Sequence, residues 1–275
     1  MPATIHCDVA IVGGGLAGGM IALALRKKRP DCDVRLIEGG ARIGGNHLWS
    51  FFASDVAAAD RWLAAPLVSY GWTRYDVAFP AHRRTIRAPY YSVESERFDR
   101  IVREAMPAEA LMMRRKALAA SSKAVVLADG DRVEAGGVID CRGPGELGLL
   151  DLGWQKFHGR EFALADAHDL EHPLVMDATV AQIDGYRFVY ALPFAATRAV
   201  RRGHLLQRRA RARHRDVGGA DRRLCRGARL AGRSRRARGG GGAAGGDGRR
   251  FSTPIGNRAA TRSPRRGCAP GCSTR

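Results

Sequence analysis

Three glycines near the start of the chain have the spacing of a loop that binds a dinucleotide. Gly13, Gly15 and Gly18 fit the pattern G-x-G-x-x-G, and Gly14 lies between the first two. Glycines at this spacing allow a tight turn and let the backbone approach a pyrophosphate closely. If a helix begins at the loop, its free N–H groups and partial positive charge favour the phosphates. We therefore expect a pyrophosphate to bind at these four glycines.

The surrounding residues predict the elements that would hold this loop in place. Residues 7–12 form a short, mostly apolar run that is typical of a buried parallel strand. Residues 20–29 predict a helix that Pro30 stops, and residues 34–37 predict a second strand. That strand leads to Glu38, 20 residues beyond the last glycine, where a carboxylate can accept hydrogen bonds from ribose hydroxyls. The series indicates a Rossmann-like α/β domain, and a glycine-rich turn without a ligand is the alternative.

The residues after Glu38 favour FAD over NAD as the bound nucleotide. They read Gly39-Gly40-Ala41-Arg42-Ile43-Gly44-Gly45. An acidic residue, a short spacer, a basic residue and a glycine pair are the usual continuation in flavoproteins of the glutathione-reductase type. Arg42 is therefore a candidate FAD ligand, and the alternative is that it is a cation on a surface loop.

A later segment predicts a hairpin that leads back to the nucleotide. Residues 125–139 read as two strands around Asp129-Gly130-Asp131, which is a turn signal. The second strand leads into Asp140-Cys141-Arg142-Gly143. A strand that ends in Asp and small residues commonly returns to the nucleotide in this class of flavoprotein, whereas an ordinary strand end is the alternative.

The cysteines and the apolar runs argue against several other classes of protein. The chain has 6 cysteines, and no two have the C-x-x-C spacing, so we expect no metal site and no disulfide framework. A reducing, cytoplasmic setting follows as the default. No stretch approaches the roughly 18 uncharged apolar residues of a membrane-spanning helix. The N-terminal segment has no basic region before a long apolar core, so we expect no signal peptide.

The positive charge of the chain is concentrated in its last part. The net charge is +19, and residues 201–275 hold 22 basic and 3 acidic residues, against 24 of each in residues 1–200. Every basic residue of this tail is Arg, and the tail also contains a run of four glycines at 239–242. The composition allows an arginine-rich arm that binds nucleic acid, a disordered linker, or the right gene read in the wrong frame. In each case we expect no packed core after residue 200.

Several segments of residues 1–200 resemble bacterial lycopene β-cyclases. Gly44-Gly45-Asn46-His47-Leu48-Trp49-Ser50-Phe51 is similar to the G-G-N-H-x-W-S-F segment of that family. Further similar segments follow in family order, at residues 66–80, 91–98, 155–161 and 176–194. Core packing is the alternative for any single aromatic residue among them, and a loop histidine bonded to backbone is the alternative for His47.

The resemblance implies a fold, a reaction and a set of partners. The fold is a FAD-binding α/β domain of the glutathione-reductase type with the start of a β-rich substrate domain. The reaction is the acid-catalysed, non-redox closure of the acyclic ψ-ends of lycopene into β-ionone rings, an intramolecular lyase or isomerase activity. It requires reduced FAD, with NAD(P)H as the reductant. The substrate is lycopene or another acyclic carotene, so a peripheral position on the inner face of the membrane is expected, with His47 and Trp49 on the substrate side.

After residue 200 the resemblance returns only when the coding frame is changed. Family members continue with a segment like V-E-D-T-Y-Y-S-D, whereas this chain reads R-R-G-H-L-L-Q-R-R from Arg201. The codons CGT CGA GGA CAC CTA CTA CAG CGA CGC encode the latter, and removal of the first base gives V-E-D-T-Y-Y-S-D. A second shift near Phe251 gives further family-like segments, including G-L-F-H-P. We therefore predict that residues 201–275 are an out-of-frame translation and that the chain as written lacks the catalytic acid and is inactive.

Two other classes of function stay open at this point. A FAD-dependent oxidoreductase or hydroxylase would share the same nucleotide domain. An arginine-rich nucleic-acid-binding protein would use the tail, and its DNA binding would depend on salt and disappear when the tail is deleted. We expect no specific binding of nucleic acid.

Overall fold

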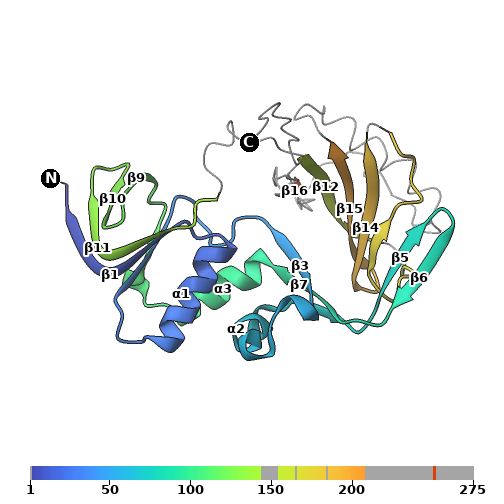
Figure 1. Ribbon diagram of the computed structural model, residues 1–275, viewed down its shortest axis with the longest axis horizontal. Helices are drawn as coiled ribbons and strands as arrows, with labels where there is room; N and C mark the ends of the chain where they lie inside the picture. The colour runs from blue at the N-terminus through green and yellow to red at the C-terminus, as the bar shows by residue number, and fades with distance from the viewer. Residues whose placement is uncertain (1, 144–153, 165, 184, 208–249, 252–275) are drawn as a thin grey trace, which may run out of the picture.

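The computed structural model describes residues 2–143, 154–164, 166–183, 185–207 and 250–251. In these ranges the chain forms three β-sheets and three α-helices (Figure 1). A six-stranded sheet with two helices lies at one end and a seven-stranded sheet at the other (Figure 1). A three-stranded sheet lies between them (Figure 1).

The six-stranded sheet carries the expected Rossmann-like unit. Its strand order is β8-β2-β1-β11-β10-β9, with β1, β2, β8 and β11 parallel and the last two strands antiparallel. The strands are β1 (Thr4–Val12), β2 (Val34–Glu38), β8 (Leu111–Met113), β9 (Ala117–Ala120), β10 (Ala124–Leu127) and β11 (Arg132–Asp140). The last three residues of β1 are fully buried, because strands flank β1 on both sides and helices cover one face of the sheet. Burial of this kind agrees with the continuous apolar run at the end of the strand.

Two helices pack closely against one face of this sheet. Helix α1 (Leu16–Lys28) begins directly after Gly15, four residues earlier than predicted, and ends two residues before Pro30. Helix α3 (Ser95–Ala105) buries Phe98 and Val102 completely against it. A Cβ atom on Gly19 would lie 2.4 Å from the Phe98 ring, so the absence of a side chain there allows the two helices to approach.

The predicted hairpin between residues 125 and 139 is confirmed. Strands β10 and β11 pair antiparallel around the turn, and Gly130 has a φ of +93°, a conformation that favours glycine. The Asp131 carboxylate accepts hydrogen bonds from the backbone of Ala3 and from Arg115. β11 pairs in parallel with β1 and ends at Asp140, so it returns to the edge where the glycine loop lies.

The three-stranded sheet has one face toward each end of the molecule. It consists of β3 (Leu48–Phe52), β4 (Tyr70–Trp72) and β7 (Tyr90–Glu94), in the antiparallel order β3-β7-β4. Between β3 and β4 the chain forms α2 (Arg61–Ala64) and the short 3-10 turns η1 (Ala53–Asp55), η2 (Ala58–Asp60) and η3 (Ala65–Leu67), while η4 (Ala108–Ala110) precedes β8. The sequence had placed no sheet here, because its pairings join residues 18 to 46 positions apart in the chain.

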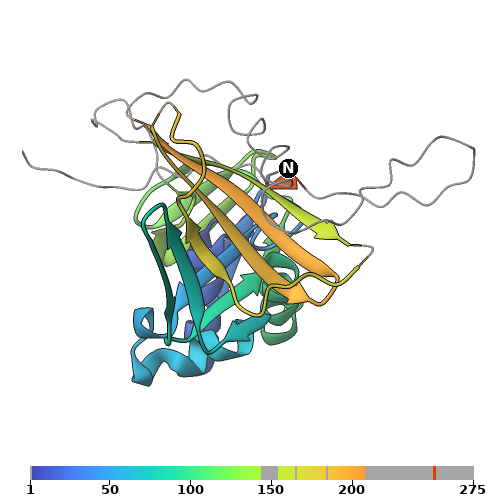
Figure 2. The same ribbon diagram turned by 90° about the vertical axis from the view of Figure 1, so that its right-hand side faces the viewer.

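The seven-stranded sheet forms the start of the predicted substrate domain (Figure 2). Its order is β16-β12-β15-β14-β13-β5-β6. The strands are β5 (Tyr75–Phe79), β6 (His82–Ile86), β12 (Trp154–Ala163), β13 (Leu174–Asp177), β14 (Tyr186–Ala195), β15 (Arg198–Gln207) and β16 (Arg250–Phe251). A core joins it to the three-stranded sheet, formed by buried residues of both sheets: Leu48, Tyr90, Val175, Leu192 and Val200.

The predicted boundary after residue 200 falls inside a strand. β15 continues from Arg198 to Gln207 and pairs with β14 on one side and β12 on the other. A ladder of backbone hydrogen bonds depends little on side chains, so the two neighbouring strands can extend it past the predicted change of frame. The remainder of the predicted tail, apart from Arg250 and Phe251, lies outside the described residues.

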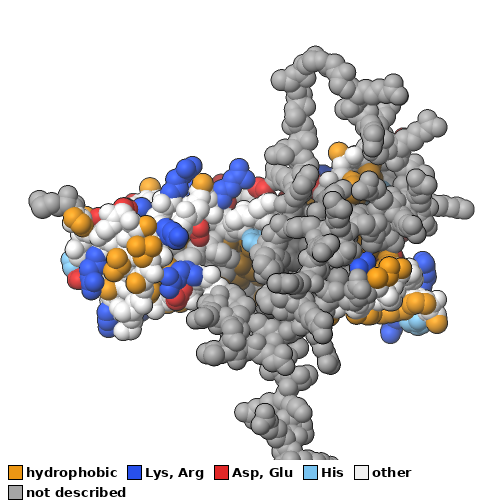
Figure 3. All heavy atoms as spheres, turned by 90° about the horizontal axis from the view of Figure 1, so that it is seen from above, with side chains coloured by type: hydrophobic (Ala, Val, Ile, Leu, Met, Phe, Trp, Pro, Cys, Tyr) orange, Lys and Arg blue, Asp and Glu red, His pale blue; other side chains and the backbone are white. Residues whose placement is uncertain are grey.

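The surface agrees with the balanced charge of residues 1–200. Over the end of the molecule that carries the six-stranded sheet, basic and acidic side chains are interspersed (Figure 3). Exposed ion pairs there include Arg29 with Asp31 and Arg132 with Glu134.

Arg198 connects the seven-stranded sheet to the three-stranded sheet, and its removal should destabilise the fold. Its guanidinium group donates to the Tyr70 hydroxyl at 2.7 Å and to Glu94 at 3.1 Å, and it also pairs with Glu161. The side chain is 42% exposed, so solvent screens these pairs, and we expect Arg198→Met to cost about 1–2 kcal/mol of unfolding free energy. Urea denaturation would measure it.

Arg84→Met is the matched control for this prediction, because Arg84 lies on β6 and is exposed. It should leave the denaturation midpoint unchanged. Equal midpoints for the two variants would show that the Arg198 network contributes no stability.

Candidate functional site

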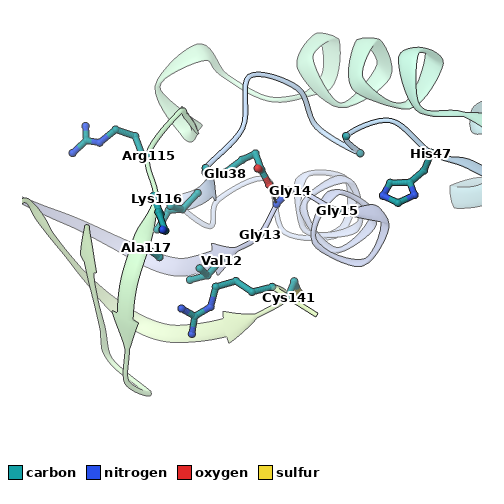
Figure 4. Close-up of a pocket in the computed structure, with 15 residues that line it drawn as sticks. Val12, Gly13, Gly14, Gly15, Glu38, His47, Arg115, Lys116, Ala117 and Cys141 are labelled. Atoms are coloured by element: carbon teal, nitrogen blue, oxygen red, sulfur yellow. Dashed lines mark hydrogen bonds between the residues drawn. The ribbon is translucent and has the colours of Figure 1, made fainter. Parts of the chain in front are cut away.

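A cavity of about 420 Å³ lies at the carboxyl ends of the parallel strands, where ligands bind in folds of this type (Figure 4). Its walls come from the ends of β1, β2 and β11 and from the segments that follow β2 and β8. The lining residues are Val12, Gly13, Gly14, Gly15, Ile37, Glu38, Gly39, Gly44, Gly45, His47, Arg115, Lys116, Ala117, Cys141 and Arg142. The cavity thus brings together the first three glycines of the predicted loop, Glu38 and His47.

The glycines of the loop differ in what they do. Gly13 has a φ of +104°, and a Cβ atom there would lie 2.7 Å from the Cys141 carbonyl oxygen. A Cβ atom on Gly18 would lie 2.0 Å from the Gly13 carbonyl oxygen, so this residue allows α1 to pack on the loop. A Cβ atom on Gly15 would meet no atom within 4 Å, and Gly15 lines the cavity. Gly15 therefore leaves open the space that a pyrophosphate would need.

Glu38 holds the glycine loop in place (Figure 4). One carboxylate oxygen accepts a hydrogen bond from the Gly14 backbone at 2.7 Å, and the other accepts one from the Gly40 backbone at 2.6 Å. Each oxygen of an ionised carboxylate can accept a second hydrogen bond. Glu38 can therefore fix the loop and still bind ribose hydroxyls.

The cations that line the cavity differ from the one that the sequence predicted. Arg42 is exposed and does not line the cavity, whereas Arg115, Lys116 and Arg142 do. Arg115 forms ion pairs with Asp129 and Asp131 of the hairpin turn. Sequence reasoning missed Arg115 and Lys116 because only the pairing of β8 with β2 brings them to the pocket.

Arg142 follows β11 and pairs with the last residue of that strand. Its guanidinium group donates to both carboxylate oxygens of Asp140, and these hydrogen bonds lower the pKa of Asp140 to about 2. The strand end returns to the cavity, since Cys141 and Arg142 line it, and its contact with a nucleotide stays a prediction. The available signal was the Asp140-Cys141-Arg142 segment itself.

His47 lies at the opposite end of the cavity from Arg115 and Lys116 (Figure 4). Its ring stacks on Trp49 with the centroids 5.5 Å apart, and Trp49 in turn packs edge-on against Phe98. Burial lowers the pKa of His47, and the nearby Arg202 guanidinium lowers it further. Trp49 does not line the cavity. Its ring stacks on the His47 ring and so orients it.

Beyond His47 lies a buried cluster of aromatic and hydroxyl side chains. Tyr90 is 3% exposed and its hydroxyl is hydrogen-bonded to Tyr190 and Ser50, which in turn lies 2.7 Å from the Ser92 hydroxyl. Burial is the main reason why the pKa of both tyrosines is raised. The sequence had assigned Ser50, Ser92 and Tyr190 no role beyond family resemblance, and it had assigned Tyr90 none.

Position 202 on β15 faces this cluster. Arg202 is the cross-strand partner of Tyr190, and its guanidinium group donates to the Leu48 carbonyl at 3.0 Å. Burial lowers the pKa of Arg202, and burial together with Arg202 lowers the pKa of His204 to about 3. The environment at this position therefore disfavours charge.

The described part of the chain offers neither a metal site nor a membrane-spanning helix. It contains no group of three or more His, Cys, Asp and Glu side chains that could hold a metal ion. Within the same residues, every helix is too short or too polar to cross a membrane.

Solved structures with the same arrangement of elements place the fold in a known class. A geranylgeranyl bacteriochlorophyll reductase-like protein from Thermoplasma acidophilum superposes with a TM-score of 0.58 at 16% identity, over 82% of this chain and 62% of that chain. The 2,6-dihydroxypyridine-3-hydroxylase from Arthrobacter nicotinovorans superposes with a TM-score of 0.53 at 16% identity, over 77% of this chain and 58% of that chain. At these identities the likeness concerns the fold alone. The chain shares the α/β fold of these enzymes.

Sequence comparison narrows this class to one family. The family model described as lycopene cyclase protein matches residues 8–209. The lycopene beta-cyclase of Pseudescherichia vulneris is 42% identical over 189 residues, which are 69% of this chain and 49% of that protein. The corresponding protein of Pantoea ananas is 40% identical over 194 residues, which are 70% of this chain and 50% of that protein. The chain belongs to the lycopene cyclase family, and it spans about half the length of these relatives.

Proposed function

We propose that residues 1–200 are the nucleotide-binding part of a lycopene β-cyclase that closes the ψ-ends of lycopene into β-ionone rings. The observation that carries the proposal is the junction at His47. There the cavity at the glycine loop ends beside the aromatic core that joins the three-stranded sheet to the seven-stranded sheet. The relatives named lycopene beta-cyclase supply the substrate and the reaction.

The residues of the cavity fit FAD. The open space above Gly15 and the N-terminus of α1 would receive the pyrophosphate, and Glu38 would bind the ribose of the adenosine half. The cavity then leads to His47, which would lie near the flavin ring. Bound FAD in its reduced form would stabilise a carbocation electrostatically, with NAD(P)H as the reductant.

Protonation of the terminal double bond requires a carboxylic acid with a raised pKa in a dry pocket. The tertiary cation formed in this way is attacked by the neighbouring double bond, and loss of a ring proton completes an isomerisation without net redox change. In the shifted frame, V-E-D-T-Y-Y-S-D places its glutamate at position 202 and its aspartate at position 203. Burial that lowers the pKa of Arg202 would raise the pKa of a carboxyl group at the same place.

The register of β15 distinguishes these two acids. Position 202 faces Tyr190, whereas Gly203 is paired with Val189 and points to the opposite face of the sheet. The glutamate would therefore meet the aromatic cluster, and the aspartate would not. This placement supports the glutamate as the proton donor and agrees with the hypothesis that the chain as written is inactive.

A FAD-dependent hydroxylase is the second candidate, and the fold likeness to a hydroxypyridine hydroxylase favours it. Product analysis tests the two against each other. A gene with the frame corrected near Val200 and Phe251 would be expressed in a bacterial host that accumulates lycopene. A cyclised carotene of unchanged mass supports the cyclase, and an oxygenated carotenoid of higher mass supports the hydroxylase.

The hydrocarbon substrate also implies a place in the cell. Acyclic carotenes of this length dissolve in lipid and not in water, so the enzyme must take its substrate from a membrane. We propose a cytoplasmic protein bound peripherally to the inner face of the membrane.

A further inference from the structure

A second cavity, of about 410 Å³, lies on the far side of the three-stranded sheet from the aromatic core. Phe51 of β3 and Tyr91 of β7 form one wall, with their ring centroids 5.5 Å apart. These two residues alternate along their strands with Phe52 and Tyr90, which face the core. The cavity is therefore separate from the proposed flavin and substrate sites.

The opposite wall is made of small apolar residues. Ala53, Ala64 and Ala65 lie on the segment of short helical turns between β3 and β4, and their methyl groups leave a groove against the two aromatic rings. The volume is within the range of small-molecule sites, and the walls are mostly apolar. The cavity has the size and chemistry to hold part of a hydrocarbon chain.

The rim of this cavity carries positive charge and an exposed indole ring. Arg61 lines the cavity, and the next residue, Trp62, is 37% exposed. Lys28 lies 5.1 Å from the centroid of the Trp62 ring, at the basic last turn of α1. Asp60 is an exposed acidic neighbour, and the Asp55 carboxylate is held by the Phe52 backbone. Exposed Trp beside Lys and Arg is typical of protein surfaces at a membrane interface.

The segment between β3 and β4, which carries Arg61 and Trp62, is held in position by α3 and by the core. The Arg97 guanidinium group on α3 donates two hydrogen bonds to the Pro66 carbonyl, at 3.0 and 2.8 Å. Leu67, the last residue of η3, is 2% exposed and anchors the segment in the core. The exposed groups therefore project from a fixed base, and α2, which carries Arg61 and Trp62, lies at the lower edge of the molecule in Figure 1.

We propose that this surface, formed by Lys28, Arg61, Trp62 and the adjoining cavity, docks the protein on a phospholipid membrane. The cavity takes part of an acyl chain, Trp62 enters the interfacial region, and the two cations lie against lipid phosphates. The inference rests on the proposed function, because an enzyme that acts on a carotene must meet the membrane that holds it. The proposed surface is where that meeting would take place. The contacts that carry it are independent of the cyclase chemistry.

Vesicle sedimentation of the full chain tests the proposal. The vesicles consist of phosphatidylcholine and phosphatidylglycerol, and salt on the order of 0.5 M screens attraction between the arginine-rich tail and the lipid. We expect Trp62→Ala to lower the partition coefficient about tenfold, because about 1.4 kcal/mol of interfacial burial is lost. Ala65→Trp should fill the cavity and lower the coefficient about fivefold.

Ala59→Trp is the matched control, since Ala59 is exposed on the same segment and does not line the cavity. It should bind as the parent does or slightly better. Ala65 is itself exposed, so its variant should keep the parent's circular dichroism even if Trp62→Ala does not. Equal partition of parent, Trp62→Ala and Ala65→Trp would overturn the proposal, as would loss of all binding in salt. Vesicle binding by this surface without cyclisation in the frame-corrected protein would refute the proposed function alone.

Discussion

In the frame-corrected protein, replacing the glutamate at position 202 by glutamine should stop the conversion of lycopene to β-carotene. The parent with the corrected frame should turn a lycopene-accumulating host from red to orange-yellow. An amide cannot donate the proton that starts the reaction, and loss of a general acid costs about 10²–10⁴-fold in rate. Flavin content should change little, because position 202 lies beyond His47 and outside the lining of the nucleotide cavity.

The neighbouring aspartate provides the control for this experiment. Position 203 points to the opposite face of the sheet, so replacing that aspartate by asparagine should retain most of the activity. Equal losses at the two positions would contradict the register argument. Cyclisation of lycopene by the uncorrected chain would show that the tail is genuine protein and that the frameshift hypothesis is wrong.

The nucleotide-binding half of the fold was predictable because its signals are local. Gly13, Gly15 and Gly18 must follow one strand and begin one helix, and Glu38 must end the next strand, so their spacing fixes their arrangement. The hairpin at Gly130 was equally local, since two short strands and a turn signal lie within fifteen residues. Patterns of this kind depend on a few neighbouring residues.

The features that were missed depend on pairings between distant parts of the chain. Arg115 reaches the cavity only because β8 is added to the edge of β2. The cluster around Tyr90 requires β3, β7, β14 and β15 to meet, and no local pattern specifies that meeting. The role of Arg42 as a FAD ligand stays a prediction, and its side chain is exposed and does not line the cavity.

The second large effect is expected at the glycine loop. Gly15→Val in the frame-corrected protein should lower the flavin content after purification about tenfold or more. Gly15 has a φ of −69° and a ψ of −173°, an extended conformation that valine adopts readily. A Cβ atom there meets no protein atom within 4 Å, so the new side chain should occupy the space reserved for the pyrophosphate. Absorbance of the flavin relative to protein measures the loss.

The other glycines show why this variant separates binding from folding. At Gly18 a Cβ atom would lie 2.0 Å from the Gly13 carbonyl oxygen, so Gly18→Ala must move α1 or the loop and should destabilise the flavin-free protein by about 1–3 kcal/mol. Gly15→Val should leave the thermal midpoint of the flavin-free protein unchanged, since nothing in the protein has to move. Loss of flavin with an unchanged midpoint therefore locates the pyrophosphate above Gly15. Normal flavin content in Gly15→Val would exclude this loop as the FAD site, whatever the activity of the protein.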